Sequence, residues 1–187
     1  MSRTRPFYSF NSHGLSLIEL IITVTTLATL VALATPSLTT LMLRNEQTTA
    51  ANSFLNHFYF ARSLAVQKEK HLIICPSEDG KSCIENGNWS RGLIVYEDRK
   101  RNGILDPDDP VHGQYILPKN SKISIHSSKA RTKVVYHGDG RPSGYNLTLT
   151  FCDPEERIEP KALIVNNVGR IRISDHGPGD SPLQCEH

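Results

Sequence analysis

The chain has 187 residues and a formal net charge of +2, from 21 basic and 19 acidic side chains. This balance excludes a uniformly basic protein, so any site for an anionic partner must be a local patch. Roughly 145 residues follow the apolar segment near the N-terminus, which is enough for one domain with a hydrophobic core.

The first predicted element is an apolar helix. From Leu15 to Ala34 the only charged residue is Glu19. At a rise of ~1.5 Å per residue, a helix of this length spans a hydrocarbon layer of ~30 Å. A carboxylate in such a segment is costly, so Glu19 is a candidate functional residue that needs a partner. An ordinary secretory signal cut near Ala32-Leu33-Ala34, or a plain membrane anchor, would leave Glu19 unexplained.

The residues around Glu19 carry a resemblance. The stretch Gly14-Leu15-Ser16-Leu17-Ile18-Glu19-Leu20 resembles the leader of type IV pilins and of type II secretion pseudopilins. In that family a prepilin peptidase cuts after the glycine, the new N-terminus is methylated, and the glutamate pairs with an N-terminal amine as pilins assemble. The resemblance implies that Gly14 precedes the cut, that Leu15 becomes the N-terminus, and that Glu19 acts in assembly. The family usually has Phe where this chain has Leu15.

The flanking charges predict the orientation of the apolar segment. Arg3 and Arg5 precede it, and no dense cluster of Lys and Arg follows it closely. By the positive-inside rule, residues 1–14 lie in the cytoplasm, and the globular part lies in the periplasm after one crossing of the inner membrane.

A helical pattern resumes after Pro36. Apolar residues recur there at steps of three and four. They are Leu38, Leu41, Met42, Ala51, Phe54, Leu55, Phe58, Ala61 and Ala65. Because proline removes one helical hydrogen bond, we predict one helix from about Leu15 to about Lys70 with a kink near Pro36. Its first half is expected in the membrane and its second half on the globular domain.

Short strands follow the helix, separated by turns that contain Gly, Asn and Pro. The predicted strands are 72–75, 92–96, 115–117, 123–125, 133–136, 147–151, 161–165 and 170–173. One helix before a run of strands predicts an α+β, pilin-like fold with an antiparallel sheet. The expected divisions are a leader (1–14), a transmembrane and filament-core helix (15–37), the soluble half of the helix (38–70) and a β-rich periplasmic domain (71–187).

The four cysteines are an even number in an exported domain, which predicts two disulfides. Three pairings are possible, and the spacing favours Cys75 with Cys83 and Cys152 with Cys185. A zinc site is the alternative, but it would need short Cys-x-x-Cys or His spacings that are missing here.

The later residues narrow the resemblance. The cysteine framework, Trp89 before a Gly-Leu-Ile-Val-Tyr strand, and Gly169-Arg170-Ile171-Arg172 before the last cysteine resemble the FimT/GspH class of minor pilins and pseudopilins. The resemblance covers essentially the whole chain from Gly14. FimT-type minor pilins bind DNA during natural transformation through this Gly-Arg-x-Arg turn and neighbouring basic residues.

The Gly-Arg-x-Arg motif is the main candidate site of the globular part. Gly169 can supply a positive φ, and on a strand Arg170 and Arg172 face the same way, which suits phosphate. Arg131 and Lys133 are predicted to add to this site, as neighbouring basic residues that also include Lys129 and Arg141. In the alternative, the two arginines lie on a solvated strand and pair with Asp153 or Asp175.

Other candidate sites are weaker. Asp98, Asn102, Gly103 and Asp109 occupy positions of a calcium loop, but Lys100 stands at its third position and would repel the ion. The predicted alternative there is a surface loop with Asx turns. The histidines lack metal-ligand spacing, and the sequence gives no catalytic constellation, metal site or cofactor site. We therefore expect a filament subunit and not an exported enzyme or a metal-binding module. The remaining alternative is a FimU- or GspH-like subunit that primes or caps a filament without DNA.

Overall fold

The computed structural model describes residues 14, 16–127, 131–143 and 146–185. One long helix, α1 (Leu17–Lys68), is followed by eight strands and a short 3-10 helix, Pro178–Asp180. The chain divides into two compact units, the first ending at Thr39 and the second beginning at Thr40, so α1 contributes to both. The helix continues through Pro36. The predicted kink near Pro36 lies close to the boundary between the two units, and it stays a prediction.

The part of α1 in the first unit is long and apolar enough to cross a membrane. Its first turn is stabilised by Ser16, whose Oγ accepts a hydrogen bond from the Glu19 N–H at 3.3 Å, as an N-cap side chain does. The hydroxyls of Thr23, Thr25, Thr26 and Thr29 donate to carbonyls of the same helix. These polar side chains therefore need no outside partner in a hydrocarbon layer.

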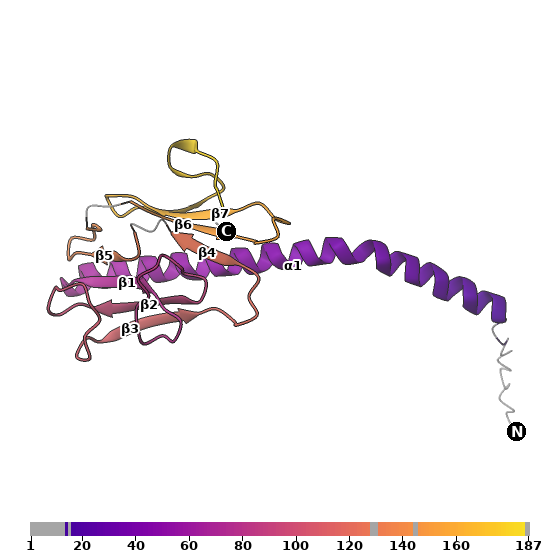
Figure 1. Ribbon diagram of the computed structural model, residues 1–187, viewed down its shortest axis with the longest axis horizontal. Helices are drawn as coiled ribbons and strands as arrows, with labels where there is room; N and C mark the ends of the chain where they lie inside the picture. The colour runs from indigo at the N-terminus through magenta and orange to yellow at the C-terminus, as the bar shows by residue number, and fades with distance from the viewer. Residues whose placement is uncertain (1–13, 15, 128–130, 144–145, 186–187) are drawn as a thin grey trace, which may run out of the picture. The chain divides into compact units, whose positions relative to one another are not determined.

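The second unit contains two antiparallel sheets of four strands (Figure 1). The first sheet has the order β3 (Val111–Ile116), β2 (Gly92–Glu97), β1 (Leu72–Pro76) and β5 (Val134–Tyr136). The second has the order β4 (Ser124–Ser127), β6 (Leu147–Cys152), β7 (Lys161–Val165) and β8 (Ile171–Ser174). The predicted α+β, pilin-like class with a long helix packed on antiparallel sheet is confirmed.

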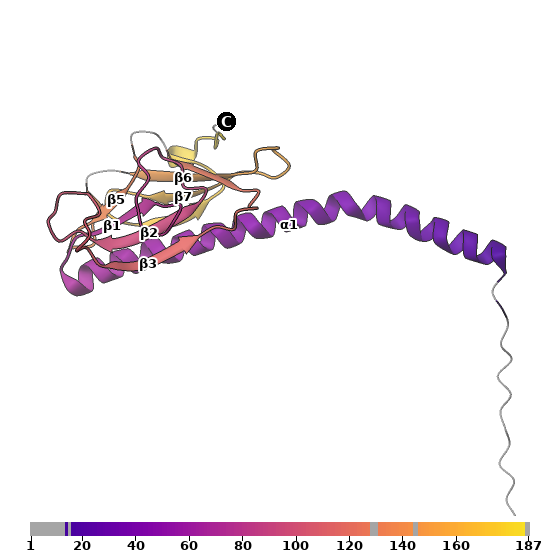
Figure 2. The same cartoon turned by 60° about the horizontal axis from the view of Figure 1, so that its bottom comes forward.

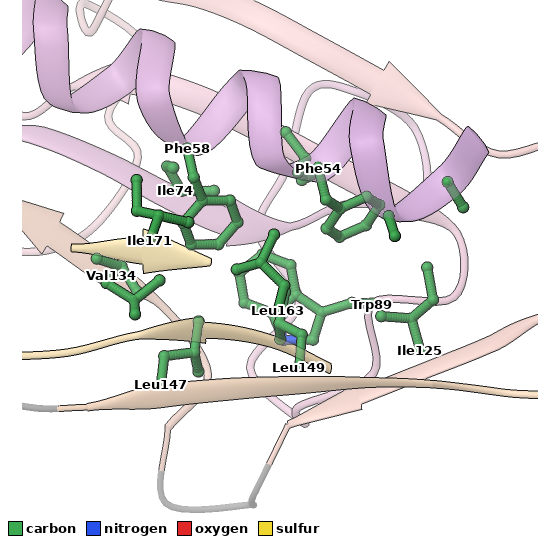
Figure 3. Close-up of a cluster of buried hydrophobic side chains, with 14 of the residues drawn as sticks. Phe54, Phe58, Ile74, Trp89, Ile125, Val134, Leu147, Leu149, Leu163 and Ile171 are labelled. Atoms are coloured by element: carbon green, nitrogen blue, oxygen red, sulfur yellow. The ribbon is translucent and has the colours of Figure 1, made fainter. Parts of the chain in front are cut away.

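The second half of α1 lies along both sheets, as two views of the molecule show (Figures 1 and 2). One hydrophobic core joins all three layers (Figure 3). The helix contributes Leu43, Ala50, Ala51, Phe54, Phe58, Ala61 and Ala65 to it. From Ala51 onward the buried residues follow the predicted stripe. The prediction is wrong for Leu38, Leu41 and Met42, since all three are exposed and the buried face begins at Leu43.

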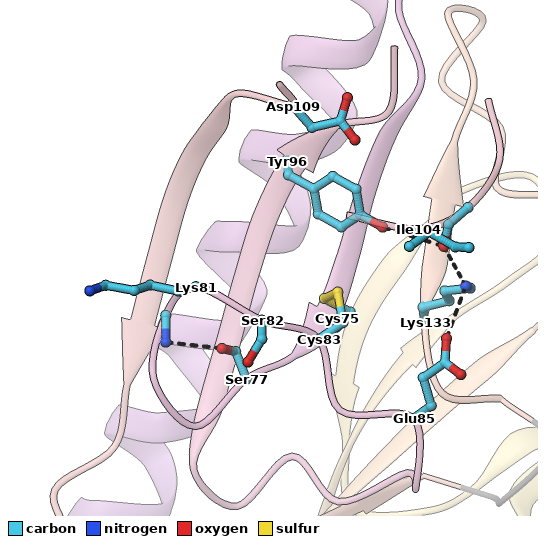
Figure 4. Close-up of a disulfide and its surroundings, with 12 residues drawn as sticks. Cys75, Ser77, Lys81, Ser82, Cys83, Glu85, Tyr96, Ile104, Asp109 and Lys133 are labelled. Atoms are coloured by element: carbon cyan, nitrogen blue, oxygen red, sulfur yellow. Dashed lines mark hydrogen bonds and ion pairs between the residues drawn. A yellow bond between two sulfur atoms is a disulfide. The ribbon is translucent and has the colours of Figure 1, made fainter. Parts of the chain in front are cut away.

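A smaller apolar cluster covers the outer side of the first sheet. It consists of Ile73, Cys75, Ile94 and Tyr96, with Cys83, Leu105 and Val135 packed against it. The disulfide between Cys75 and Cys83 lies in this cluster (Figure 4). A second disulfide joins Cys152, at the end of β6, to Cys185 in the C-terminal tail. These are the two pairings that the spacing favours.

Candidate functional site

The Gly-Arg-x-Arg motif covers the end of the turn between β7 and β8 and the first two residues of β8. Three hydrogen bonds close the turn: Asn166 N–H to Arg170 O (3.1 Å), Gly169 N–H to Asn166 O (2.9 Å), and Arg170 N–H to Asn166 Oδ1 (2.8 Å). Gly169 has a φ of +79°, and a Cβ there would lie 2.5 Å from the carbonyl oxygen of Gly140. The turn therefore requires glycine both for its backbone conformation and for its contact with the neighbouring loop.

The two arginines, one in the turn and one in β8, are exposed to solvent. Arg170 and Arg172 are exposed, while Ile171 between them is buried and Ile173 packs against the core. This alternation is the one predicted for a strand with one buried face. Among the described residues, no carboxylate forms an ion pair with Arg170 or Arg172: Asp153, one predicted partner, is bound by Arg157 instead, at 2.8 Å. Two guanidiniums in this arrangement can bind phosphate oxygens.

The helix connects the turn to a second loop. Arg62 of α1 donates from Nε to Gly140 O at 2.9 Å and from Nη2 to Val168 O at 3.4 Å. Residues 137–143 form the loop after β5, and this contact brings the loop against the β7–β8 turn. Arg141 follows Gly140 and binds the carboxylate of Asp139 at 2.8 Å. The fold thus brings the loop with Arg141 close to the Gly-Arg-x-Arg motif. The sequence named Arg141 among the basic residues that could lie there, without placing it.

The other basic residues of the predicted site differ in their surroundings. Arg131 donates to Asn146 O at 2.9 Å, and the register from β6 through β7 to β8 puts Asn146 and Arg170 at the same end of the second sheet. Arg131 also lines a hollow of about 320 Å³ beside β4 and β6.

Lys133 immediately precedes β5 of the first sheet, and its side chain points toward Glu85 (Figure 4). Its ammonium donates to Gly103 O at 2.6 Å and pairs with Glu85 at 3.5 Å. Because a backbone carbonyl and a carboxylate already hold this charge, Lys133 is the weakest member of the predicted set.

The loop that imitates a calcium site is closed by its own backbone. Asp98 accepts hydrogen bonds from the N–H groups of Asn102 and Gly103, and Asp109 accepts from those of Arg99 and Asp106. The described residues contain no group of three or more His, Cys, Asp or Glu side chains that could hold a metal ion. The N–H of Ile104 also donates to Asn102 Oδ1 at 3.0 Å, so the loop has an Asx turn, as in the alternative that the sequence favours.

Sequence reasoning missed one pair of side chains. His71 and His137 meet because Leu72 pairs with Tyr136 between β1 and β5, which puts the neighbouring histidines opposite each other. His137 Nδ1 lies 3.4 Å from His71 Nε2, and His137 Nε2 lies 2.9 Å from Ser143 Oγ. Only the strand pairing brings them together, so no local spacing could have revealed them.

The surroundings of His71 predict how it titrates. Burial lowers the pKa of His71 below its usual value, His137 and Arg101 lower it further, and Asp98 opposes them. We expect the NMR titration midpoint of His71 to lie below about 6.5 and to rise in a His137→Gln variant, but not in the control His176→Gln, whose side chain is exposed. The free energy of unfolding should decrease as pH falls from about 6.5, because the unfolded chain takes up this proton first. A His71 midpoint at or above 6.5 would contradict this description.

The predicted leader and assembly residues lie at the start of the first unit. Glu19 is exposed in the first turn of α1. A Cβ added at Gly14 would meet no other atom within 4 Å, and Leu15 lies outside the described residues. Cleavage after Gly14 and the assembly role of Glu19 stay predictions.

Comparisons with known proteins find one matching family and several similar structures. The family described as Type II transport protein GspH matches residues 50–169. A crystal structure of the type IV minor pilin FimU from Pseudomonas aeruginosa has a TM-score of 0.55 and 19% identity, covering 70% of this chain and 90% of that one. Another crystal form of FimU has a TM-score of 0.50 and 18% identity, covering 68% of this chain and 91% of that one. The minor pseudopilin EpsH of Vibrio cholerae has a TM-score of 0.49 and 14% identity, covering 72% of this chain and 98% of that one. No curated protein sequence matches the chain significantly.

Proposed function

The chain belongs to the GspH family of type II transport proteins, which are minor pilins and pseudopilins, and we propose that it is a FimT-like minor pilin that binds DNA for uptake in natural transformation. In this proposal a prepilin peptidase cuts after Gly14. The apolar half of α1 anchors the protein in the inner membrane, with residues 1–14 in the cytoplasm and the second unit in the periplasm. The helix then packs among other pilins in a type IV pilus.

The observation that carries the DNA-binding proposal is the pair of exposed arginines at the β7–β8 turn. Arg170 and Arg172 have no carboxylate partner within the described part of the chain, so a phosphate would not have to displace one. Their backbone is already ordered by the side chain of Asn166 and by the helix, which lowers the entropic cost of binding. Arg131 lies at the same end of the domain and can extend the positive surface, while the charge of nearby Arg141 is offset by Asp139.

The expected binding is weak, independent of sequence and sensitive to salt. Phosphate contacts release counterions, and each contact contributes a slope of about −0.9 to the dependence of log K on log salt. A site built on two phosphate contacts should therefore lose roughly tenfold in affinity between 50 and 200 mM salt. Several subunits in one filament would add their contacts along the same duplex.

A mobility shift with double-stranded DNA tests this function on the full chain in uncharged detergent. We expect Arg170→Gln/Arg172→Gln to weaken binding more than about tenfold and to flatten the salt dependence. The matched control is Arg99→Gln/Lys100→Gln, which removes the same charge from exposed side chains on another loop and should bind normally. An equal loss in both variants would mean that net charge alone governs the binding.

The alternative is a structural minor pilin or pseudopilin that primes or caps a pilus, or a type II secretion pseudopilus, without binding DNA. One observation favours it: the family match ends at Gly169, immediately before the two arginines. If the full chain fails to bind DNA at 50 mM salt, this structural function replaces the first proposal.

A further inference from the structure

Two polar side chains of α1 anchor the segment that carries Arg170. Tyr59 donates from its hydroxyl to Ile171 O at 2.9 Å, and Arg62 donates to Val168 O at 3.4 Å. The two anchored carbonyls lie on either side of Arg170 along the chain. Tyr59 and Arg62 are three residues apart, so they lie on one face of the helix.

The same face of the helix also holds the neighbouring loop. Arg62 Nε binds Gly140 O, and a Cβ at Gly140 would lie 2.9 Å from Cγ2 of Val66. The guanidinium of Arg62 is partly buried, and no carboxylate in the described ranges pairs with it. Its hydrogen bonds therefore go to the carbonyls of the two loops, and its charge is retained beside Arg170.

We propose that Tyr59 and Arg62 are positioning residues that fix the β7–β8 turn on α1, so that Arg170 is held in the conformation that contacts a DNA phosphate. This inference rests on the proposed function for its DNA partner. An exposed turn held at only one end would have to be ordered when DNA binds, and that entropic cost would reduce the affinity. Loss of a positioning residue therefore lowers the affinity without removing a phosphate contact.

The salt dependence distinguishes positioning from direct contact. Tyr59→Phe removes one hydroxyl and no charge, so we expect binding to weaken about threefold to tenfold with an unchanged salt slope. Arg170→Gln should weaken binding and also reduce the slope by about 0.9. Arg62→Lys keeps the charge but loses the planar donor that reaches two carbonyls, and it should behave like Tyr59→Phe. The matched control is Tyr96→Phe. It removes a hydroxyl from β2 of the first sheet, where that hydroxyl donates to Gly103 O, and it should leave binding unchanged.

Amide hydrogen exchange supplies a readout that does not need DNA. In Tyr59→Phe, the amides of Gly169 and Arg170 should exchange several-fold faster than in the parent chain, while the amides of β1 and β2 keep their rates. If exchange accelerates in Tyr59→Phe but neither the parent chain nor this variant binds DNA, Tyr59 does hold the turn on α1 and the proposed DNA-binding function is wrong. Unchanged exchange at the turn, or a reduced salt slope in Tyr59→Phe, would overturn the positioning role.

Discussion

Replacement of Glu19 by Ala is expected to keep the protein in the membrane and to remove it from assembled filaments. Glu19 is the only charged residue between Leu15 and Ala34. When apolar helices pack side by side, this carboxylate needs a positive partner, which the N-terminal amine of a neighbouring subunit can provide. Removing one member of a buried ion pair costs about 3–5 kcal/mol. We expect that loss to reduce incorporation by a factor of roughly a hundred or more.

The measurement compares membranes with sheared filaments by immunoblot. The membrane fraction should contain equal amounts of the parent chain and of Glu19→Ala, while the filament fraction should lack the variant. Glu19→Gln keeps the shape of the side chain and should fail in the same way. The control is Thr26→Ala, because the Thr26 hydroxyl bonds carbonyls of its own helix and its loss should be tolerated. Glu19→Ala at parental levels in filaments would exclude the ion-pair mechanism.

Local patterns in the sequence were enough to predict the helix and the place of each strand, but not the bounds of every strand. Buried strands such as 72–75 and 161–165 are short apolar runs between turn residues, and the structure has β1 and β7 there. The strand predicted at 115–117 begins earlier, at Val111, because the residues before Tyr115 pair with β2 although most of them are polar or small. Strand pairing satisfies their backbone groups whatever their hydropathy is.

The composition of the candidate site depended on contacts that a local pattern does not contain. The motif itself predicted the turn, the exposure of its arginines and the inward direction of Ile171. The sequence could not tell which other basic residues lie near the motif, because nothing in their local sequence distinguishes Arg141 from Lys133. Only the pairing of β1 with β5 decides that Lys133 lies beside Glu85, while the loop with Arg141 reaches the turn. No local pattern in the sequence singled out Tyr59 or Arg62 as part of the site.

Replacement of Phe54 by Ala is expected to destabilise the second unit by about 3–5 kcal/mol, the usual cost of deleting a buried Phe side chain. Phe54 is completely buried between the helix and the sheets (Figure 3). Its ring packs edge-on against Tyr115 at 5.9 Å and Phe151 at 5.4 Å, so it touches residues from both sheets. The methyl group of Ala would leave most of this space empty. The loss is a large fraction of the total stability of a typical domain.

Urea unfolding of the full chain in detergent, followed by fluorescence of the buried Trp89, measures the difference. The midpoint should fall in Phe54→Ala with little change in slope, while Phe60→Ala on the exposed side of the same helix should change stability by less than about 1 kcal/mol. Phe54→Leu keeps most of the volume and serves if the Ala variant does not fold. A loss for Phe60→Ala as large as for Phe54→Ala would show that the core is not where the structure places it. Because the core around Phe54 and Phe58 fixes the helix that carries Tyr59 and Arg62, the packing of this core also determines where Arg170 points.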